Sequence, residues 1–245
     1  MPALTVLALV LAFALVTAGC TSHGGTGHAR PRSSGPRPLT AGEADGLALM
    51  RSMNERAGTR SITIRLPGRP GLVIRGWVDF AHHVGYGTVS PGSADAAADE
   101  LISWNLQVVG LQPWHRTTAP LPMPRQGWQA APLSPTTSVR DDVLAVVLNL
   151  AASRPDNADL LRQSDARWLR RAHVGSSPVD VVAGPSSDAP GTRDDAATRN
   201  RRGNVRYWVA AGGELRRVQI RDGSTGLWSQ ADLGPSSAVR LVASR

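Results

Sequence analysis

The stretch ITIRLPGRPGLVIRGWVDF, residues 62–80, decides the fold class. Apolar and polar residues alternate with a period of two on both sides of its central PGRPG segment, which is composed mainly of turn-forming residues. In each half the apolar residues share one face, and these residues are Ile62, Ile64, Leu66, Leu72, Ile74, Val78 and Phe80. The stretch therefore predicts two neighbouring antiparallel strands joined by a tight turn.

Two more strands are predicted directly after this pair. Residues 84–89 form a glycine-containing strand, and residues 101–109 form a strand with Ile102, Trp104, Leu106 and Val108 on one face. Four consecutive strands with short connections predict an antiparallel meander. The following segment, residues 111–135, contains six prolines and is expected to be an irregular loop.

A helix is predicted before the meander, over residues 41–56. Thr40 and Glu43 have the spacing of a capping box, and apolar residues follow at helical steps at Leu47 and Met50. Gly58 is expected to end this helix. The period then changes from 3.6 to two, which marks the start of the sheet.

Two helices are predicted after the proline-rich loop. Ser138 is expected to cap the first, whose residues 143–150 are apolar around most of the circumference, so that this helix should be deeply covered. We expect Arg154-Pro155 to end it and Pro155 to open a second, short helix.

Strands resume after these helices, and the fold class is therefore α+β. The predicted order is one helix, four strands, two helices and then five or six strands. The later strands are expected at residues 166–174, 179–183, 205–210, 215–221, 227–233 and 239–243.

The first residues predict an exported protein. From Leu4 to Val16 every residue except Thr5 is apolar, and no charged side chain precedes Arg30. At about 1.5 Å per residue, a helix of this length is shorter than the ~30 Å hydrocarbon core of a bilayer, so the run indicates a secretory signal. The absence of a basic residue before Leu4 departs from that pattern, and a misassigned start codon would explain it.

The apolar run ends at Val16-Thr17-Ala18-Gly19-Cys20, which resembles the lipobox of bacterial lipoproteins. The resemblance implies that Cys20 is acylated, and Cys20 is the lipid-attachment residue that we predict. The alternative is cleavage after Ala18, which would leave a free thiol with no second cysteine to pair with. We favour the lipid anchor, which places the chain at the extracytoplasmic face of a cell membrane.

The chain is accordingly predicted to have three parts. Residues 1–19 form a lipoprotein signal peptide, residues 20–39 form a flexible tether rich in Gly, Ser and Pro, and residues 40–245 form a single domain. Within that domain, residues 186–203 are polar and poor in apolar side chains, and we expect a mobile loop there.

The charge of the chain is strongly positive. The formal net charge is +8, and the sequence contains no lysine, so arginine supplies all of the 27 basic side chains counted as Lys and Arg. Codon bias toward arginine explains this composition, and a basic surface also suits anionic lipid headgroups. Nucleic acid is not an expected partner, because the chain is predicted to be exported and has no recognition motif.

Asp79, His82 and His83 form the one clustered group with the chemistry for metal binding or acid–base work. Surface polarity at a hairpin end is the favoured interpretation, because no third strong ligand has suitable spacing. The sequence has no nucleophile-elbow or phosphate-loop motif. We therefore predict no enzyme activity, no catalytic residue, no metal and no cofactor.

The order of elements behind a lipobox resembles the actinobacterial LppX/LprAFG lipoproteins and the wider LolA-like fold. The segments 148–158 and 206–218, the second with a Trp-containing strand that returns through a Leu-Arg run, are similar to segments of that family. The resemblance implies a strongly curved antiparallel sheet, a half-barrel, with helices covering its concave face. It also implies that acyl chains occupy the apolar space between sheet and helices, but it assigns no ligand-contacting residue.

The sequence leaves open whether such a cavity exists. Gly85 and Gly87 would thin its lining, whereas long side chains opposite residues 143–150 would fill it as an ordinary core. Our hypothesis is a non-enzymatic, membrane-anchored envelope lipoprotein that binds or carries a lipid or glycolipid. The alternative is an envelope interaction or sensor module with a filled core and a protein partner; an exported hydrolase has the least support.

Overall fold

The computed structural model describes residues 35–92, 100–186 and 204–241. The chain divides into two compact units, residues 1–34 and residues 35–245, and every described element belongs to the second. The predicted signal peptide, Cys20 and most of the predicted tether therefore lie outside the described residues. The predicted mobile loop lies outside them too, except for Ser186 at its start.

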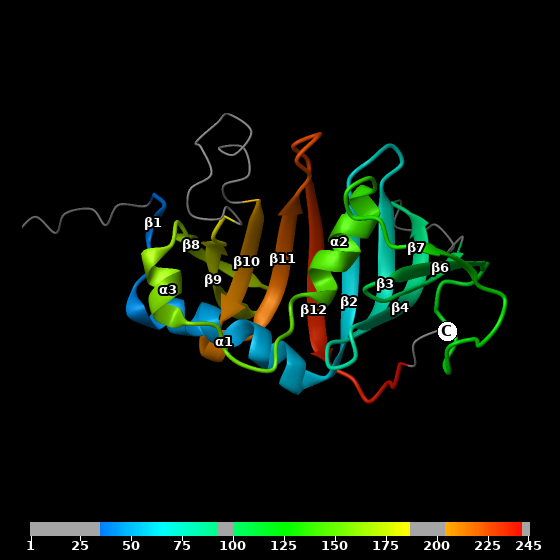
Figure 1. Cartoon of the computed structure of the whole chain (residues 1–245), viewed down its shortest axis with the longest axis horizontal. Helices are drawn as coiled ribbons and strands as arrows, with labels where there is room; N and C mark the ends of the chain where they lie inside the picture. The colour runs from blue at the N-terminus through cyan, green and yellow to red at the C-terminus, as the bar shows by residue number, and fades with distance from the viewer. Residues whose placement is uncertain (1–34, 93–99, 187–203, 242–245) are drawn as a thin grey trace, which may run out of the picture. The chain divides into compact units, whose positions relative to one another are not determined.

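The second unit is built on a twelve-stranded antiparallel sheet (Figure 1). The order is β1-β8-β9-β10-β11-β12-β2-β3-β4-β5-β6-β7, so the sheet runs from β1 at one edge to β7 at the other and is not closed into a barrel. Its strands are β1 (Arg37–Pro38), β2 (Thr59–Leu66), β3 (Leu72–Asp79), β4 (Val84–Pro91), β5 (Glu100–Trp104), β6 (Val108–Pro113), β7 (Gln129–Pro132), β8 (Arg167–Val174), β9 (Ser177–Ala183), β10 (Val205–Ala210), β11 (Leu215–Arg221) and β12 (Trp228–Ser236). A large antiparallel sheet with few helices is confirmed, while the half-barrel curvature stays a prediction.

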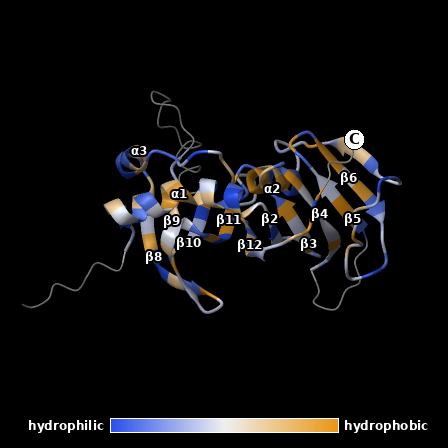
Figure 2. Ribbon diagram, turned by 90° about the horizontal axis from the view of Figure 1, so that it is seen from below, coloured by the Kyte–Doolittle hydropathy of each residue, from blue (hydrophilic) through white to orange (hydrophobic). Residues whose placement is uncertain are grey.

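The described α-helices are α1 (Ala41–Ala57), α2 (Val139–Leu148) and α3 (Ala158–Gln163), and they lie on one face of the sheet (Figures 1 and 2). A short 3-10 turn, η1 (Ala211–Gly213), joins β10 to β11. The capping box of Thr40 and Glu43 is confirmed, and Ser138 caps α2 by accepting a hydrogen bond from the Asp141 amide.

The second helix ends earlier than the sequence predicts. It ends at Leu148 and not at Arg154-Pro155, because the Asn149 side chain bonds the Ala145 carbonyl and Asn149 no longer has helical geometry. The third helix begins after Asn157, whose side-chain oxygen accepts hydrogen bonds from two amides of its first turn, and not at Pro155.

The strand predicted over residues 101–109 is two strands, β5 and β6. Asn105 breaks it, because its side-chain oxygen accepts hydrogen bonds from the amides of Gln107 and Val108 and forms a turn. Leu106 is consequently 47% exposed and does not share the buried face of Ile102 and Trp104. The alternation of apolar residues from Ile102 to Val108 therefore continues through a turn, although these residues do not form one strand.

Two further predictions at the end of the sheet are corrected. The proline-rich loop contains a short edge strand, β7, which pairs with β6. The strand predicted at 239–243 is absent from its described part, residues 239–241. Leu241 instead packs beside Tyr86 and Leu101, in a second apolar cluster that includes side chains of the proline-rich loop.

The main core lies between the sheet and the helices. Side chains of α2 pack with Ile102 and Trp104, as the sequence predicts; the largest of them to be fully buried are Val143, Leu144 and Leu148. The indole of Trp104 lies over Gly85 so closely that a Cβ there would meet ring atoms at 2.0 Å. Gly85 therefore does not open a cavity, because Trp104 fills the space above it.

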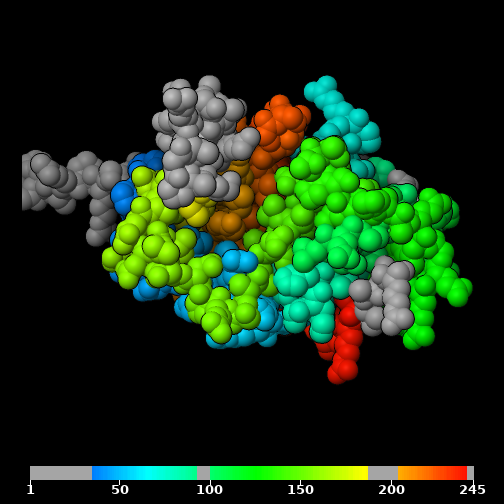
Figure 3. Space-filling view, viewed as in Figure 1, coloured from blue at the N-terminus to red at the C-terminus, as the bar shows by residue number. Residues whose placement is uncertain are grey.

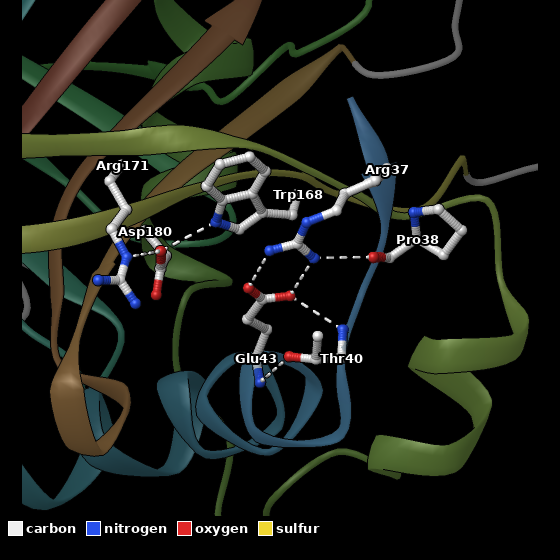
Figure 4. A network of polar contacts seen from close by, with 7 residues as sticks. All are labelled: Arg37, Pro38, Thr40, Glu43, Trp168, Arg171 and Asp180. Carbon is white, nitrogen blue, oxygen red and sulfur yellow. Dashed lines mark hydrogen bonds and ion pairs between the residues drawn. The ribbon is translucent and has the colours of Figure 1, made fainter. Parts of the chain in front are cut away.

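A network of polar contacts holds β1 against the rest of the unit (Figure 4). Arg37 binds both carboxylate oxygens of Glu43 at 2.8 and 2.7 Å, and its guanidinium stacks 4.2 Å from the Trp168 ring centroid. These hydrogen bonds from Arg37 lower the pKa of Glu43 to about 2. Arg37 and Pro38, which the sequence places in the tether, are thus part of the sheet.

Candidate functional site: a groove between α1, α3 and β10

The described helical face is hollowed between α1, α3 and β10. The groove has a volume of about 530 Å³ and is lined on its apolar side by Leu47, Met50, Leu160, Leu161 and Tyr207. In Figure 3 strand surface is visible between the helices on the left of this face and α2 on its right. The volume falls in the range of roughly 300–1,000 Å³ that is typical of small-molecule pockets.

The wall formed by α1 is tied to the segment that leads into α3. The Arg51 side chain donates to the carbonyls of Asn149 and Ala151, both at 3.2 Å, and its Nη1 lies 3.4 Å from the Asp156 carboxylate. The Asp156 amide donates to the Ala48 carbonyl at 3.0 Å. Arg51 and Asp156 therefore fix the width of the groove and also form its polar rim.

Tyr207 lies at the groove on the strand side. Its ring lies against Gly184, where a Cβ would come within 2.7 Å of the ring edge. Burial raises the pKa of the Tyr207 phenol, so the side chain stays neutral at physiological pH and presents an uncharged surface to the groove.

A buried arginine supports the end of α1. Arg60 is only 2% exposed and donates to Asn54 Oδ1 at 3.0 Å and to the Gly234 carbonyl at 2.9 Å. Asn54 in turn donates to the Leu150 carbonyl at 2.8 Å. Burial lowers the pKa of Arg60, and Glu214 opposes that shift from 3.6 Å away. This network joins α1 to β2, to β12 and to the segment after α2.

A second, more polar hollow of about 470 Å³ lies near the first turn of α1. Its carboxylates already have partners, since Glu43 binds Arg37 and Asp180 accepts from Trp168 Nε1 at 2.9 Å and lies 3.6 Å from Arg171 Nε (Figure 4). This hollow is therefore part of the network that holds β1, and its carboxylates are already bound within that network.

Of the three residues that the sequence groups, the structure brings Asp79 and His82 together and directs His83 elsewhere. Asp79 accepts hydrogen bonds from the amides of Ala81 and His82 and lies 2.9 Å from His82 Nδ1. His83 turns away and donates to the Leu148 carbonyl at 2.9 Å. Among the described residues, no group of His, Cys, Asp and Glu has the arrangement to hold a metal ion. Asp79, which is buried, and His82 form a turn, and His83 attaches it to the end of α2.

The groove lies away from the place where the sequence leaves a cavity open. Opposite residues 143–150, where a filled core is the default expectation, the structure has a filled core. Tyr207, Leu160 and Leu161 were not singled out, because they are separated in sequence and only the folded sheet brings β10 beside α3. The sequence offers only the apolar pair Leu160-Leu161 in a short helix as a signal, and the 63% exposure of Leu160 emerges only from the structure.

The comparisons with known proteins define no family. No protein-family model matches the sequence, and no curated protein gives a significant match. An uncharacterized conserved protein from Thermus thermophilus is 11% identical, with 80% of this chain and 87% of that chain covered and a TM-score of 0.38. A putative outer membrane lipoprotein-sorting protein domain from Vibrio parahaemolyticus is 10% identical, with 81% and 92% covered and a TM-score of 0.27. Because these values are low, neither likeness assigns an activity to this chain.

One further property concerns membranes. No helix within the described ranges combines the length and the apolar character that crossing a bilayer requires.

Proposed function

We propose that this chain is a membrane-anchored envelope lipoprotein of LolA-like architecture that binds or carries a lipid-like amphiphile, with an acyl chain in the groove between α1, α3 and β10. The observation that supports it is the lining of the groove. Leu47, Met50, Leu160 and Leu161 offer an apolar wall that faces the neutral ring of Tyr207. At the rim, Arg51 uses three of its five donors on Asp156 and on the carbonyls of Asn149 and Ala151, so two donors remain for a headgroup.

Physical reasoning favours an acyl chain over a polar ligand. Removing apolar surface from water contributes about 25 cal/mol per Å², or ~0.8 kcal/mol for each methylene that is buried. A polar ligand would find its hydrogen-bonding partners among Arg51, Asp156, Asn157 and Ser164, whereas the rest of the lining is aliphatic or aromatic and suits a hydrocarbon chain. The amphiphile is therefore expected to place its chain inside and its headgroup near Arg51.

The test uses the full chain and a fluorescent long-chain fatty acid as the probe. Leu160→Asp places a charge in the lining at a residue that is 63% exposed, so the fold should tolerate the change while probe affinity falls about tenfold or more. Leu227→Asp is the matched control, because Leu227 is 50% exposed and lies outside the groove. Equal affinities of the two variants, or no probe binding by the parent chain, would contradict the proposal.

The anchor is tested separately. Replacing Cys20 by Ser should move the chain from the membrane fraction to the soluble fraction, since acyl chains supply the affinity for the bilayer. Unchanged retention at the membrane would refute acylation at Cys20 without bearing on the groove.

The alternative function, an interaction or sensor module with a protein partner, is favoured by one observation. The core between α2 and the sheet is filled, with Trp104 packed onto Gly85. A chain that binds no fatty acid and is crosslinked to an envelope protein would support this alternative.

A further inference from the structure

The sheet face opposite the helices carries a concentration of arginines. Residues paired directly across antiparallel strands place their side chains on the same face. One row of such pairs runs from Arg75 on β3, through Asp232 on β12 and Arg217 on β11, to Arg170 on β8. An adjacent row joins Arg65 on β2 to Arg206 on β10 through Gln230 and Gln219.

These rows lie on the face that the helices do not cover. The residues that alternate with them along the strands include Ile64, Ile74, Val218 and Ala231, and all four belong to the core beneath the helices. Arg221 pairs with Trp228 and extends the same face by one more cation. We call this set the arginine face, and it comprises Arg65, Arg75, Arg170, Arg206, Arg217 and Arg221.

Negative charge does not balance the arginine face. Asp232 is the carboxylate in these rows, and it binds Arg65 and Arg217. Among the described residues, Arg75, Arg170, Arg206 and Arg221 have no carboxylate within ion-pair distance. Burial lowers the pKa of Arg206, and the positive charges of Arg170 and Arg221 lower it further.

Contacts with aromatic rings and with neighbouring oxygen atoms fix the positions of four of these arginine side chains. The Arg206 guanidinium stacks 4.0 Å from the Trp228 ring centroid, and Arg217 lies 5.9 Å from that of Trp208. Arg221 Nε donates to the Gly226 carbonyl, and Arg75 donates to the Ser90 hydroxyl. Guanidinium groups held in this way keep donors free for phosphate oxygens and lose less conformational freedom on binding.

We propose that the arginine face is a docking surface for the anionic phospholipid headgroups of a bilayer. Seven neighbouring strands from β3 to β8 span about 29 Å at ~4.8 Å per strand, so the cations are spread over a broad area and match an extended layer of phosphates. A hollow of about 550 Å³ at the turn between β2 and β3 has both Arg65 and Arg75 in its lining. The contact is separate from the groove on the helical face and from the predicted acyl anchor, and it depends on neither.

The experiment measures cosedimentation of the full chain with vesicles of phosphatidylcholine alone or mixed with phosphatidylglycerol. The parent chain and every variant carry Cys20→Ser, so that no acyl chain contributes to binding. This parent should bind the anionic vesicles more tightly than the neutral vesicles, and the difference should decrease as the salt concentration increases. Arg75→Gln, Arg170→Gln and Arg206→Gln together should lower affinity for anionic vesicles about a hundredfold, because each cation near such a surface contributes about fivefold.

The matched control removes the same charge elsewhere. Arg56, Arg154 and Arg162 are exposed side chains on or beside the helices, and their replacement by Gln should change affinity only a few-fold. Equal losses in the two triple variants, or equal binding of neutral and anionic vesicles by the parent, would overturn the proposal. If replacing Arg206 impairs folding, as judged by circular dichroism, Arg75→Gln with Arg170→Gln should still lower affinity about thirtyfold.

Discussion

The guanidinium of Arg37 and the carboxylate of Glu43 form a two-pronged ion pair that joins β1 to the first turn of α1. Glu43 also accepts a hydrogen bond from the Thr40 amide at 2.9 Å, so one carboxylate completes the capping box and holds the edge strand. The Glu43 side chain is 14% exposed, and solvent therefore screens the pair only in part. We make four predictions about the described unit, two from polar contacts such as this ion pair and two from close packing of glycines against aromatic rings.

Stability should depend on pH through Glu43. Its pKa is about 2 in the folded chain, below the ordinary value of 4.5, so its contribution is present above pH 5 and is lost as pH falls toward 2. Glu43→Gln should lower the free energy of unfolding by about 2 kcal/mol at pH 7 and flatten the acid limb of the pH profile. Chemical denaturation of the full chain across pH checks this, with the exposed Asp45→Asn on the same helix as control. Identical profiles for the two variants would contradict the prediction.

Asn54 should be among the most sensitive polar residues. Asn54→Leu removes a hydrogen-bond acceptor from the buried Arg60 guanidinium and a donor from the Leu150 carbonyl. We expect a loss of about 3 kcal/mol, because the buried Arg60 guanidinium loses one of its acceptors and the Leu150 carbonyl loses its side-chain donor. Ser52→Ala is the control, since Ser52 is also buried but bonds only the Leu49 carbonyl of its own helix, and it should cost no more than about 1 kcal/mol. Thermal unfolding measures both, and similar losses would argue against the network.

Gly85→Ala should destabilise the chain through Trp104. The new methyl group would overlap the indole, and we expect a cost of about 2 kcal/mol, which should shrink in a Trp104→Leu background where the overlap is relieved. Gly46→Ala in α1 meets nothing within 4 Å and should stabilise the helix by about 0.5–1 kcal/mol. Additive effects of the Gly85 and Trp104 substitutions would show that the two residues do not interact.

Gly184→Ala should alter the groove more than the stability. A methyl group at residue 184 would press on the edge of the Tyr207 ring and move this partly buried side chain. We expect affinity for the fatty-acid probe to fall several-fold while the free energy of unfolding changes by less than about 1 kcal/mol. Gly223→Ala, with open space around it, should leave both values unchanged. Unchanged probe affinity for Gly184→Ala would indicate that Tyr207 does not contact the ligand.

Local chemistry explains which parts of the fold the sequence predicts well. Thr40 and Glu43 define the start of α1 because the capping box requires only residues three apart. The alternation around residues 62–80 predicts the positions and pairing of β2 and β3. In β3 the burial does not alternate, because Val73 and Ile74 are both buried and Leu72 is 37% exposed. The pattern does not reveal the turn at Asn105, because a single side-chain oxygen reverses the chain inside an uninterrupted alternation.

The groove and the arginine face lie beyond what periodicity reveals. Tyr207 and Leu160 line the same groove only because β10 lies beside β9 in the sheet. That strand order depends on contacts between residues far apart in the sequence. Arg65, Arg206 and Arg217 are three unrelated positions until the strand registers align them. The lipid anchor at Cys20 stays a prediction, because it lies outside the described residues.

All described α-helices lie on one side of the sheet, and this sidedness has a consequence for cargo release. A bilayer that receives Arg75 and Arg206 on one side leaves the mouth between α1 and α3 facing the aqueous compartment. Under the two proposals, a ligand in the groove would therefore exchange with the aqueous side and not directly with the leaflet beneath the arginine face.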